Sequence, residues 1–365
     1  MTKIKDITKH LEKTAPSPYQ ESYDNSGLLV GDPEAEVQQV LISLDTTEEV
    51  IKEAINLGCT LIISHHPIIF KGLKKLTGTT YAERVVIEAI KNNIALYALH
   101  TNFDNVQAGV NKAIARRLEL DNTKILSPKT GILSKLTTFI PPDFTKPVLD
   151  ALHKAGAGMI GNYDHCSFQV SGTGTFRPNE SAKPYTGSRN EFEEVAENRI
   201  EIIFPSYLKS QILNALHKTH PYEEIAYYLH DLANTYQDTG SGMIGTLTHE
   251  MESRQFILYL KEKMNCNIIR HTAFVKDKIK TVAFCGGAGS FLLNKAKSAG
   301  ADIFISADFK YHEFFDAENE IIIADIGHYE SEVFTKELFF EILNEKFPKF
   351  ALHLSKVDTN PIFYI

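Results

Sequence analysis

The sequence predicts an α/β protein in which two α/β halves form one core, with an inserted ferredoxin-like α+β domain. Short apolar strand patterns alternate with helical patterns in the first third of the chain and again in the last third. The middle third breaks this alternation. A chain of 365 residues is long enough for two or three domains. The predicted parts are residues 1–127, the first half of the core, 128–238, the inserted domain, and 239–365, the second half.

The first third contains three apolar runs typical of buried strands, at 40–44, 60–63 and 94–99. Segments 47–57 and 81–91 lie between them and repeat apolar residues at helical spacing. This order predicts βαβ units.

The last third shows the same alternation of short apolar runs and helical segments. The predicted strands are 281–284, 303–305 and 321–324, and the predicted helices are 291–299, 312–317 and 332–344.

The middle third begins after the turn-rich segment 127–131 and ends in the polar stretch 231–245. Its pattern is strand, helix, strand and then strand, helix, strand, which is the order of a ferredoxin-like domain. The predicted elements are strand 134–140, helix 145–154, strand 167–170, strand 199–204, helix 206–217 and strand 224–229.

Two glycine-containing segments are predicted to be flexible. Segment 172–187 carries several Gly, Ser and Pro residues, as loops do. Segment 240–245 matches GxGxxG, but it follows the polar run 234–239 rather than a strand and leads into 246–248 rather than a helix. It is therefore interpreted as a re-entry linker and not as a dinucleotide-binding loop.

Composition and charge exclude several classes of protein. The formal net charge is −8 and no cluster of five basic residues occurs, so nucleic acid is an unfavourable partner. The cysteines Cys59, Cys166, Cys266 and Cys285 are widely spaced, which favours reduced thiols over a disulfide framework. Because the N-terminus lacks a signal-peptide core and no run reaches the length of a membrane span, the expected location is the cytoplasm, with no membrane partner.

The strongest chemical signal is Ser64-His65-His66-Pro67, directly after the predicted strand 60–63. Ligands of open α/β sheets gather beyond the carboxyl ends of the strands, and neighbouring residues there point to opposite sides. Two imidazoles could then reach two metal ions, or one metal ion and a substrate. The alternative is an exposed loop that carries two histidines by chance.

Two more loops offer a histidine together with a carboxylate. His100 and Asp104 follow strand 94–99, although alone His100 could be a structural hydrogen bonder and Asp104 a helix N-cap. If a helix begins near His328, then His328 and Glu332 share one face, whereas Glu330 points elsewhere. Acidic residues favoured at a helix start would explain the glutamates but not the histidine.

Three independent strand-end loops thus offer His and carboxylate groups and no thiol. These groups exceed the three protein ligands usual for one catalytic zinc and suit two ions with a bridging carboxylate. Imidazole with carboxylate is typical of zinc, iron or manganese. The predicted cofactor is two divalent metal ions per chain, held by His65, His66, Asp104, His328 and Glu332.

Other candidates are weaker. Cys285-Gly-Gly-Ala-Gly-Ser290 follows a strand and precedes a helical segment, so its amides could bind an anion. It lacks the Gly-Lys-Ser/Thr of a Walker loop, and neither GxSxG nor HExxH is present. Groups that could transfer a proton beside the metals are His100, Tyr311, His312 and Glu330.

These residues resemble the Nif-three-like dinuclear metal-binding proteins, a family also labelled homologues of GTP cyclohydrolase I type 2. The resemblance implies the five metal ligands named above, a toroidal homohexamer, and an insert resembling the PII signalling or CutA fold. Tyr23 stands where many members have Trp, and we expect it to serve packing rather than chemistry. The matching segments are 23–31, 64–67, 100–104, 285–290 and 327–332.

Two functions follow from this resemblance and from the predicted ligands. The first is a metal-dependent hydrolase that acts on a purine nucleotide, as a GTP cyclohydrolase does, or on a related phosphorylated small molecule. The alternative is a metal-dependent ligand-binding or regulatory scaffold without turnover.

Overall fold

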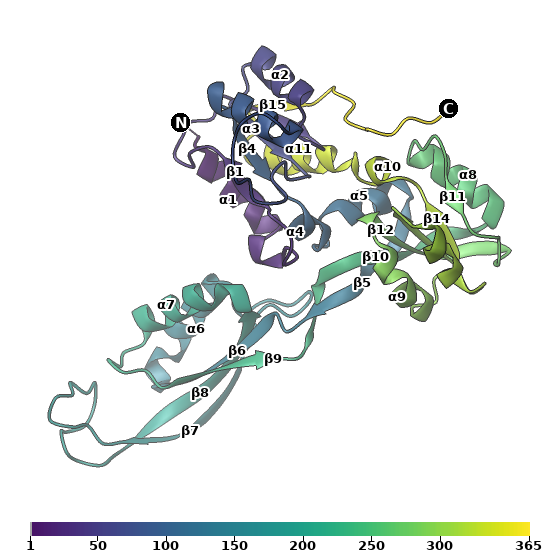
Figure 1. Ribbon diagram of the computed structural model, residues 1–365. Coiled ribbons are helices and arrows are strands. Elements are labelled where there is room, and N and C mark those ends of the chain that lie inside the picture. Colours follow the sequence, from purple (N-terminus) through teal and green to yellow (C-terminus); the bar gives the residue numbers. More distant parts are fainter. Residues whose placement is uncertain (1) are drawn as a thin grey trace. The chain divides into compact units, whose positions relative to one another are not determined.

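The computed structural model describes residues 2–365, which divide into two compact units (Figure 1). The first unit combines the chain up to Ser127 with Asp238–Ile365, and the second is Pro128–Gln237. The elements are helices and sheets of mixed type, so the predicted α/β class is confirmed.

The first sheet of unit 1 is mostly parallel. Strands β15, β2, β3 and β4 are parallel to one another, and β1 is antiparallel to β4. Its strands in spatial order are β1 (Gly27–Val30), β4 (Ala95–Ala98), β3 (Leu61–Ser64), β2 (Gln39–Ser43) and β15 (Ala351–Leu354).

Helices α2 (Glu48–Leu57) and α3 (Tyr81–Lys91) connect these strands, as the apolar spacing predicts. The hydroxyls of Thr47 and Thr80 cap the two helix N-termini by accepting from the backbone three residues on. Gly58 ends α2 in the left-handed conformation. Both helices pack with the strands around one apolar core.

The second sheet of unit 1 has apolar cores on both faces. Along β13, Ile303 and Ile305 face one core and Phe304 the other, so the run is apolar throughout. Strands β12, β13 and β14 are parallel, and β10 is antiparallel to β12. Its strands in spatial order are β11 (Arg270–His271), β14 (Ile322–Asp325), β13 (Ile303–Ala307), β12 (Lys278–Ala288), β10 (Thr235–Glu252) and β5 (Leu120–Thr130).

The two sheets exchange strands between the predicted halves. Strand β5, from the first third, joins the second sheet, and β15, from the last third, joins the first sheet beside β2. Helix α11 (Thr335–Lys346) contacts β15 and β2 as well as α1 and α5. The other helices of this unit are α1 (Ile4–Thr14), α4 (Thr101–Asp104), α5 (Val110–Arg117), α8 (Ser253–Lys263), α9 (Leu293–Ser298) and α10 (His328–Glu332), with short 3-10 turns at Ser17–Tyr19, Ser290–Leu292 and Tyr311–Ala317.

Three predictions of secondary structure in the first unit need correction. Segment 240–245 is not a flexible linker but the middle of β10. Its polar composition suggests a loop, but pairing of β10 with β12 stabilises it as a strand. Residues 312–317 belong to a 3-10 helix and not to an α-helix. The helix predicted over 332–344 is two elements, α10 and α11.

The second unit has the strand and helix order predicted for the inserted domain. All its strand pairs are antiparallel, and the apolar faces of the two helices pack on the sheet. Residues 172–176, predicted as loop, extend its edge strand. Its strands in spatial order are β7 (Phe168–Phe176), β8 (Glu193–Pro205), β6 (Leu133–Ile140) and β9 (Tyr227–Leu232), and its helices are α6 (Thr145–Lys154) and α7 (Lys209–Thr219), with 3-10 turns at Pro142–Phe144 and Ser206–Leu208.

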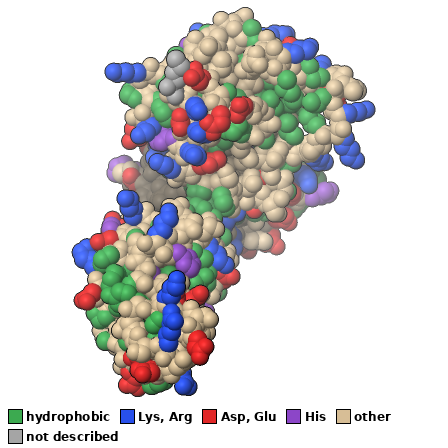
Figure 2. Space-filling model, turned by 90° about the vertical axis from the view of Figure 1, so that its left-hand side faces the viewer, with side chains coloured by type: hydrophobic (Ala, Val, Ile, Leu, Met, Phe, Trp, Pro, Cys, Tyr) green, Lys and Arg blue, Asp and Glu red, His purple; other side chains and the backbone are tan. Residues whose placement is uncertain are grey.

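The surface carries charges of both signs. On the face that Figure 2 shows, Lys and Arg side chains are interspersed with Asp and Glu side chains. Among residues 2–365, no helix combines the length and the apolar character needed to cross a membrane.

Candidate metal centre

The predicted ligands converge at the carboxyl ends of three strands of unit 1. His65 and His66 follow β3, Asp104 ends the short helix after β4, and His328 and Glu332 begin and end α10, which follows β14. Their ligand atoms, with those of His100, form three overlapping groups in which all atoms lie within 4.8 Å of one another. The groups are His65, His66 and His100; His66, His328 and Glu332; and His65, Asp104 and Glu332.

The second of these groups joins the two sheets. Oε2 of Glu332 lies 2.9 Å from Nε2 of His66 and 3.0 Å from Nε2 of His328. The structure thus places the His328 and Glu332 side chains on one side of α10, as their spacing of four predicts. Glu330 points elsewhere and accepts a hydrogen bond from Asn360.

The third group contains two buried polar atoms that have no hydrogen bond. His65 Nε2 lies 3.5 Å from Asp104 Oδ1 and 3.7 Å from Glu332 Oε1. These distances are too long for hydrogen bonds, and both Nε2 of His65 and Oδ1 of Asp104 are left without a partner within residues 2–365. Buried polar atoms are normally paired, so these two facing atoms are available as ligands for a cation.

An outer set of acceptors orients the four imidazoles. Each ring donates from Nδ1, which leaves Nε2 to face the centre, an arrangement typical of metal-bound histidines. The Nδ1 bonds run from His65 to the Leu99 carbonyl (2.7 Å), from His66 to Asp45 (2.6 Å), from His100 to Asp24 (2.7 Å) and from His328 to Asp308 (2.7 Å).

The sequence reasoning assigned no role to the carboxylates Asp24, Asp45 and Asp308. Asp45 directly follows the predicted strand 40–44, and Asp308 lies three residues after 303–305. The same strand-end rule that selected His65 and His66 could have found both of them. Asp24 lies in segment 23–31, which resembles the family but offers no chemical signal of its own.

The proton-transfer candidates separate into two kinds. The His100 ring lies 5.3 Å from the His65 ring and 5.5 Å from the His66 ring, between centroids, so it belongs to the centre. Tyr311 and His312 do not join it: both are exposed, and their described ring contacts are with each other and with Phe315.

Burial and neighbouring charges shift the pKa values of the imidazoles and carboxylates at the centre. Burial opposes a charge on His66, but Asp45 and Glu332 outweigh it and raise the pKa of that ring to about 10. The charge of Glu332 is the main cause that raises the pKa of His328 to about 11. Burial and then the Glu332 charge raise the pKa of Asp104. Burial also disfavours a charge on Glu332, but His328 and His65 more than offset it and lower its pKa.

Two amides of the glycine segment 285–290, where the sequence predicts an anion site, are engaged within the chain. The amides of Gly286 and Gly287 already donate to Asn111 Oδ1 (3.1 Å) and Ser331 Oγ (2.9 Å). Gly287 instead gives room to the centre, since a Cβ there would lie 2.4 Å from Glu332 Oε1. Burial and the charges of Asp104 and Glu332 raise the pKa of the Cys285 thiol, and Cys285 belongs to none of the three ligand groups.

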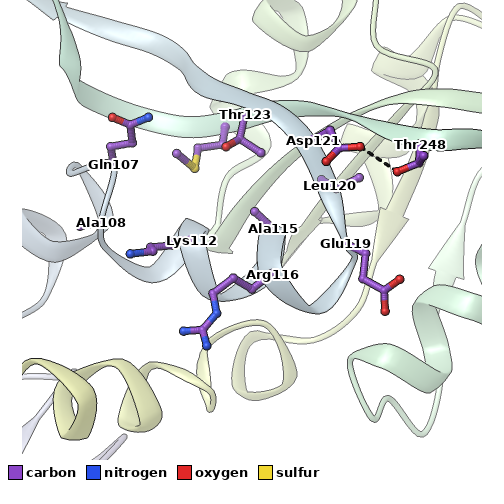
Figure 3. A pocket seen from close by; sticks show the side chains of 11 residues that line it. Gln107, Ala108, Lys112, Ala115, Arg116, Glu119, Leu120, Asp121, Thr123 and Thr248 are labelled. Atoms are coloured by element: carbon purple, nitrogen blue, oxygen red, sulfur yellow. Dashed lines mark hydrogen bonds between the residues drawn. The ribbon is translucent and has the colours of Figure 1, made fainter. Parts of the chain in front are cut away.

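A cavity of about 670 Å³ is lined by residues of α5, β5 and β10 and of the segments on either side of α5, and by none of the ligands (Figure 3). Three of its charged side chains have partners inside the chain. Asp121 accepts from Thr248 at 2.7 Å, Arg116 pairs with Glu341, and Glu119 pairs with Lys263. Within residues 2–365, none of the three groups of potential metal ligands includes a residue that lines this cavity.

The fold and the site together define an α/β protein with a candidate metal centre between two sheets of one unit. A family model described as Duf34/NIF3 (NGG1p interacting factor 3) matches residues 2–361. The chain belongs to this family, which confirms the resemblance found in the sequence.

The relatives match along the whole chain. A Bacillus subtilis protein named GTP cyclohydrolase 1 type 2 homolog is 37% identical, and the match covers 98% of each chain. The crystal structure of a Bacillus cereus protein related to NIF3 is similar with a TM-score of 0.87, at 36% identity over 100% of this chain and 99% of that chain. The crystal structure of a Staphylococcus aureus protein is similar with a TM-score of 0.80, at 32% identity over 100% of this chain and 99% of that chain.

Proposed function

We propose that the centre binds two divalent metal ions and that the protein is a metal-dependent hydrolase of a purine nucleotide or a related phosphorylated small molecule. The observation that carries this proposal is the buried, unpaired pair of atoms, His65 Nε2 and Asp104 Oδ1. They lie beside Glu332, whose two oxygens face histidines of different groups.

The residues fit metal ions by their chemistry. Every group offered is an imidazole nitrogen or a carboxylate oxygen, the ligand types that suit zinc, iron or manganese. His66, His328 and Glu332 would hold one ion, and His65, Asp104 and Glu332 the other, so that Glu332 serves both. Burial raises the pKa of Asp104, and the charge of the neighbouring Glu332 carboxylate raises it further, so a cation between them would be favoured.

Divalent ions at this centre would supply Lewis acidity and lower the pKa of a water molecule toward neutrality. The chain's own groups orient the reaction. Asp45 and Asp308 fix the His66 and His328 rings through Nδ1. His100 is fixed by Asp24 in the same way, and in this proposal its Nε2 is the group that passes a proton to or from the substrate.

The substrate class draws support from the relatives and from charge. Several relatives carry the name GTP cyclohydrolase 1 type 2 homolog, which makes a purine nucleotide the first substrate to test. A net charge of −8 disfavours a polyanionic nucleic acid. A homohexamer is part of the same proposal, and the molar mass in solution would check it.

The test is turnover by the metal-loaded protein on GTP, other nucleotides and generic phosphoesters, with His66→Ala as the inactive control and His312→Ala as the matched active one. Hydrolysis by wild type and His312→Ala, lost in His66→Ala, supports the proposal. Equal and negligible turnover in wild type and His66→Ala would replace it by the alternative, a metal-dependent binding or regulatory scaffold.

A further inference from the structure

Two exposed aromatic side chains lie beside the metal centre. Tyr23 is 65% exposed and Phe70 is 43% exposed, so both rings are accessible from the surface of the chain. Their ring centroids are 6.3 Å apart with the planes inclined at 53°. The Phe70 ring also meets the His100 ring at 6.1 Å and 80°, an edge contact that leaves part of its face open.

Hydrogen bonds hold the two segments that carry these rings next to the centre. The residue after Tyr23, Asp24, accepts from Nδ1 of His100 at 2.7 Å. The next residue, Asn25, donates to the carbonyl of Ile69 at 2.6 Å and so ties the Tyr23 segment to the Phe70 segment. Burial, with the charges of Glu21 and Asp104, raises the pKa of Tyr23.

We propose that Phe70 and Tyr23 form a stacking surface for a flat heteroaromatic ring, the nucleobase of the substrate. This inference rests on the proposed function and deepens it, because it names the part of the substrate that these residues recognise. An aromatic face stacks on any nucleobase and loses apolar exposure when it does so. The ring would then be held beside His100 and the metal ligands, and the chain itself would supply both recognition and proton transfer.

The sequence provides a clean spectroscopic test, since the chain contains no tryptophan. Phe70→Trp and Tyr23→Trp each introduce a single indole at the stacking surface. Phe192→Trp, at a 66% exposed phenylalanine of the second unit, is the control for collisional quenching. Guanosine should quench the first two variants saturably and the control only linearly, whereas ribose 5-phosphate should quench none.

Equilibrium dialysis of guanosine provides the second measurement, with the full-length, metal-loaded protein. Phe70→Leu should bind about ten-fold more weakly than wild type, the size of one lost base stack, and should keep its metal content. Equal binding by Phe70→Leu and wild type, or no saturable quenching in either tryptophan variant, would overturn the stacking surface. A smaller oligomer for Phe70→Leu would also overturn it, because the ring would then contact a second copy.

These outcomes are separable from those of the proposed function. If metal binding and turnover persist without guanosine stacking, the hydrolase proposal stands and the stacking surface fails. If guanosine binds saturably but no substrate turns over, the stacking surface stands and the hydrolase proposal fails.

Discussion

The Nε2 atoms of His66 and His328 lie 3.2 Å apart, although 262 residues separate them in the chain. One histidine follows a strand of the first sheet and the other begins a helix after a strand of the second. Each ring is held from behind by its own aspartate, Asp45 or Asp308. The centre therefore exists only when both halves of unit 1 are folded together, and the following predictions depend on that arrangement.

Replacing Glu332 by Gln should reduce the bound metal from two ions to one or none, because its carboxylate belongs to two of the three groups. Elemental analysis of protein purified after metal loading measures this. Glu330→Gln is the matched control on the same short helix, since that side chain bonds Asn360 and points away from the ligands. Circular dichroism should show both variants folded. Two ions retained in Glu332→Gln would contradict the ligand assignment.

Replacing an outer carboxylate should weaken metal binding without removing a ligand. Asp45→Asn leaves His66 in place but removes the charge that fixes its ring, and such changes typically cost about 10–100-fold in metal affinity. Competition with a chromogenic chelator would measure the loss. Asp277→Asn, at an exposed aspartate, should bind like wild type. An affinity of Asp45→Asn equal to that of the control would show that Asp45 does not position His66.

The C-terminal segment should contribute to the same network. Thr359 donates to Asp45 at 2.5 Å, on the oxygen that does not accept from His66. Thr359→Val removes this bond, so metal affinity should fall in the same direction as in Asp45→Asn but by less. In a double variant with Asp45→Asn, the Thr359 change should have no further effect, because the two act through one ring. Additive losses would show that the segment acts by another route.

The sequence predicted those parts of the molecule that follow from local patterns. Buried strands such as 303–305 are recognisable because both faces of the sheet are covered, and the spacing of His328 and Glu332 brings them together on any helix. The exchange of β5 and β15 between sheets could not be predicted, because it depends on which distant strand offers a free edge. The polar segment 240–245 reads as a loop until its partner strand is known.

Some residues of the candidate site could likewise be predicted from local patterns, and others could not. Histidines after a strand are a strong signal because few structural roles require two of them together, whereas a single aspartate there, such as Asp45 or Asp308, is also typical of a turn. Only the three-dimensional arrangement shows that each aspartate meets an imidazole. Tyr311 and His312 were selected by sequence position near a strand end, but their side chains are exposed and lie outside the ligand groups.

Metal binding should release protons. In the metal-free protein, the neighbouring carboxylates raise the pKa of His66 to about 10 and that of His328 to about 11, so this pair of rings holds protons near neutral pH. A metal ligand must be a neutral imidazole, so loading displaces these protons, and apparent affinity rises with pH below those values. Calorimetric titrations in two buffers of different ionisation enthalpy would measure the release. Binding heats that do not depend on the buffer would contradict it.

The same pKa shifts predict how the stability of the metal-free protein depends on pH. A histidine whose pKa is raised on folding stabilises the folded state fully below the unfolded value of about 6.5. This contribution is lost as pH rises from there through about 10 and 11, the folded values for His66 and His328. Urea unfolding across that range should show a declining free energy of unfolding in wild type. His66→Gln should decline less steeply, and an identical slope would show that His66 is not the titrating group.

The second unit should be removable without loss of the metal centre. Its entry and exit strands, β5 and β10, are neighbours in the second sheet, so a short Gly/Ser linker can join residues 127 and 238. All the ligands belong to the first unit, which has its own apolar cores. The shortened chain should be folded and bind as much metal as the full chain. An unfolded shortened chain would show that the first unit depends on the second.

Two glycines that both have a positive φ should separate the effect of backbone strain from that of crowding at the centre. Gly287 and Gly300 both have positive φ, +62° and +74°, so alanine at either position costs about 1–2 kcal/mol of stability. At Gly300 nothing lies within 4 Å of the added Cβ, whereas at Gly287 it would lie 2.4 Å from Glu332 Oε1. Both variants should therefore melt at lower temperature, but only Gly287→Ala should also lose metal, because its Cβ displaces the shared carboxylate. Equal metal content in the two variants would show that Glu332 can move without cost, and that its observed position is not what holds the ions.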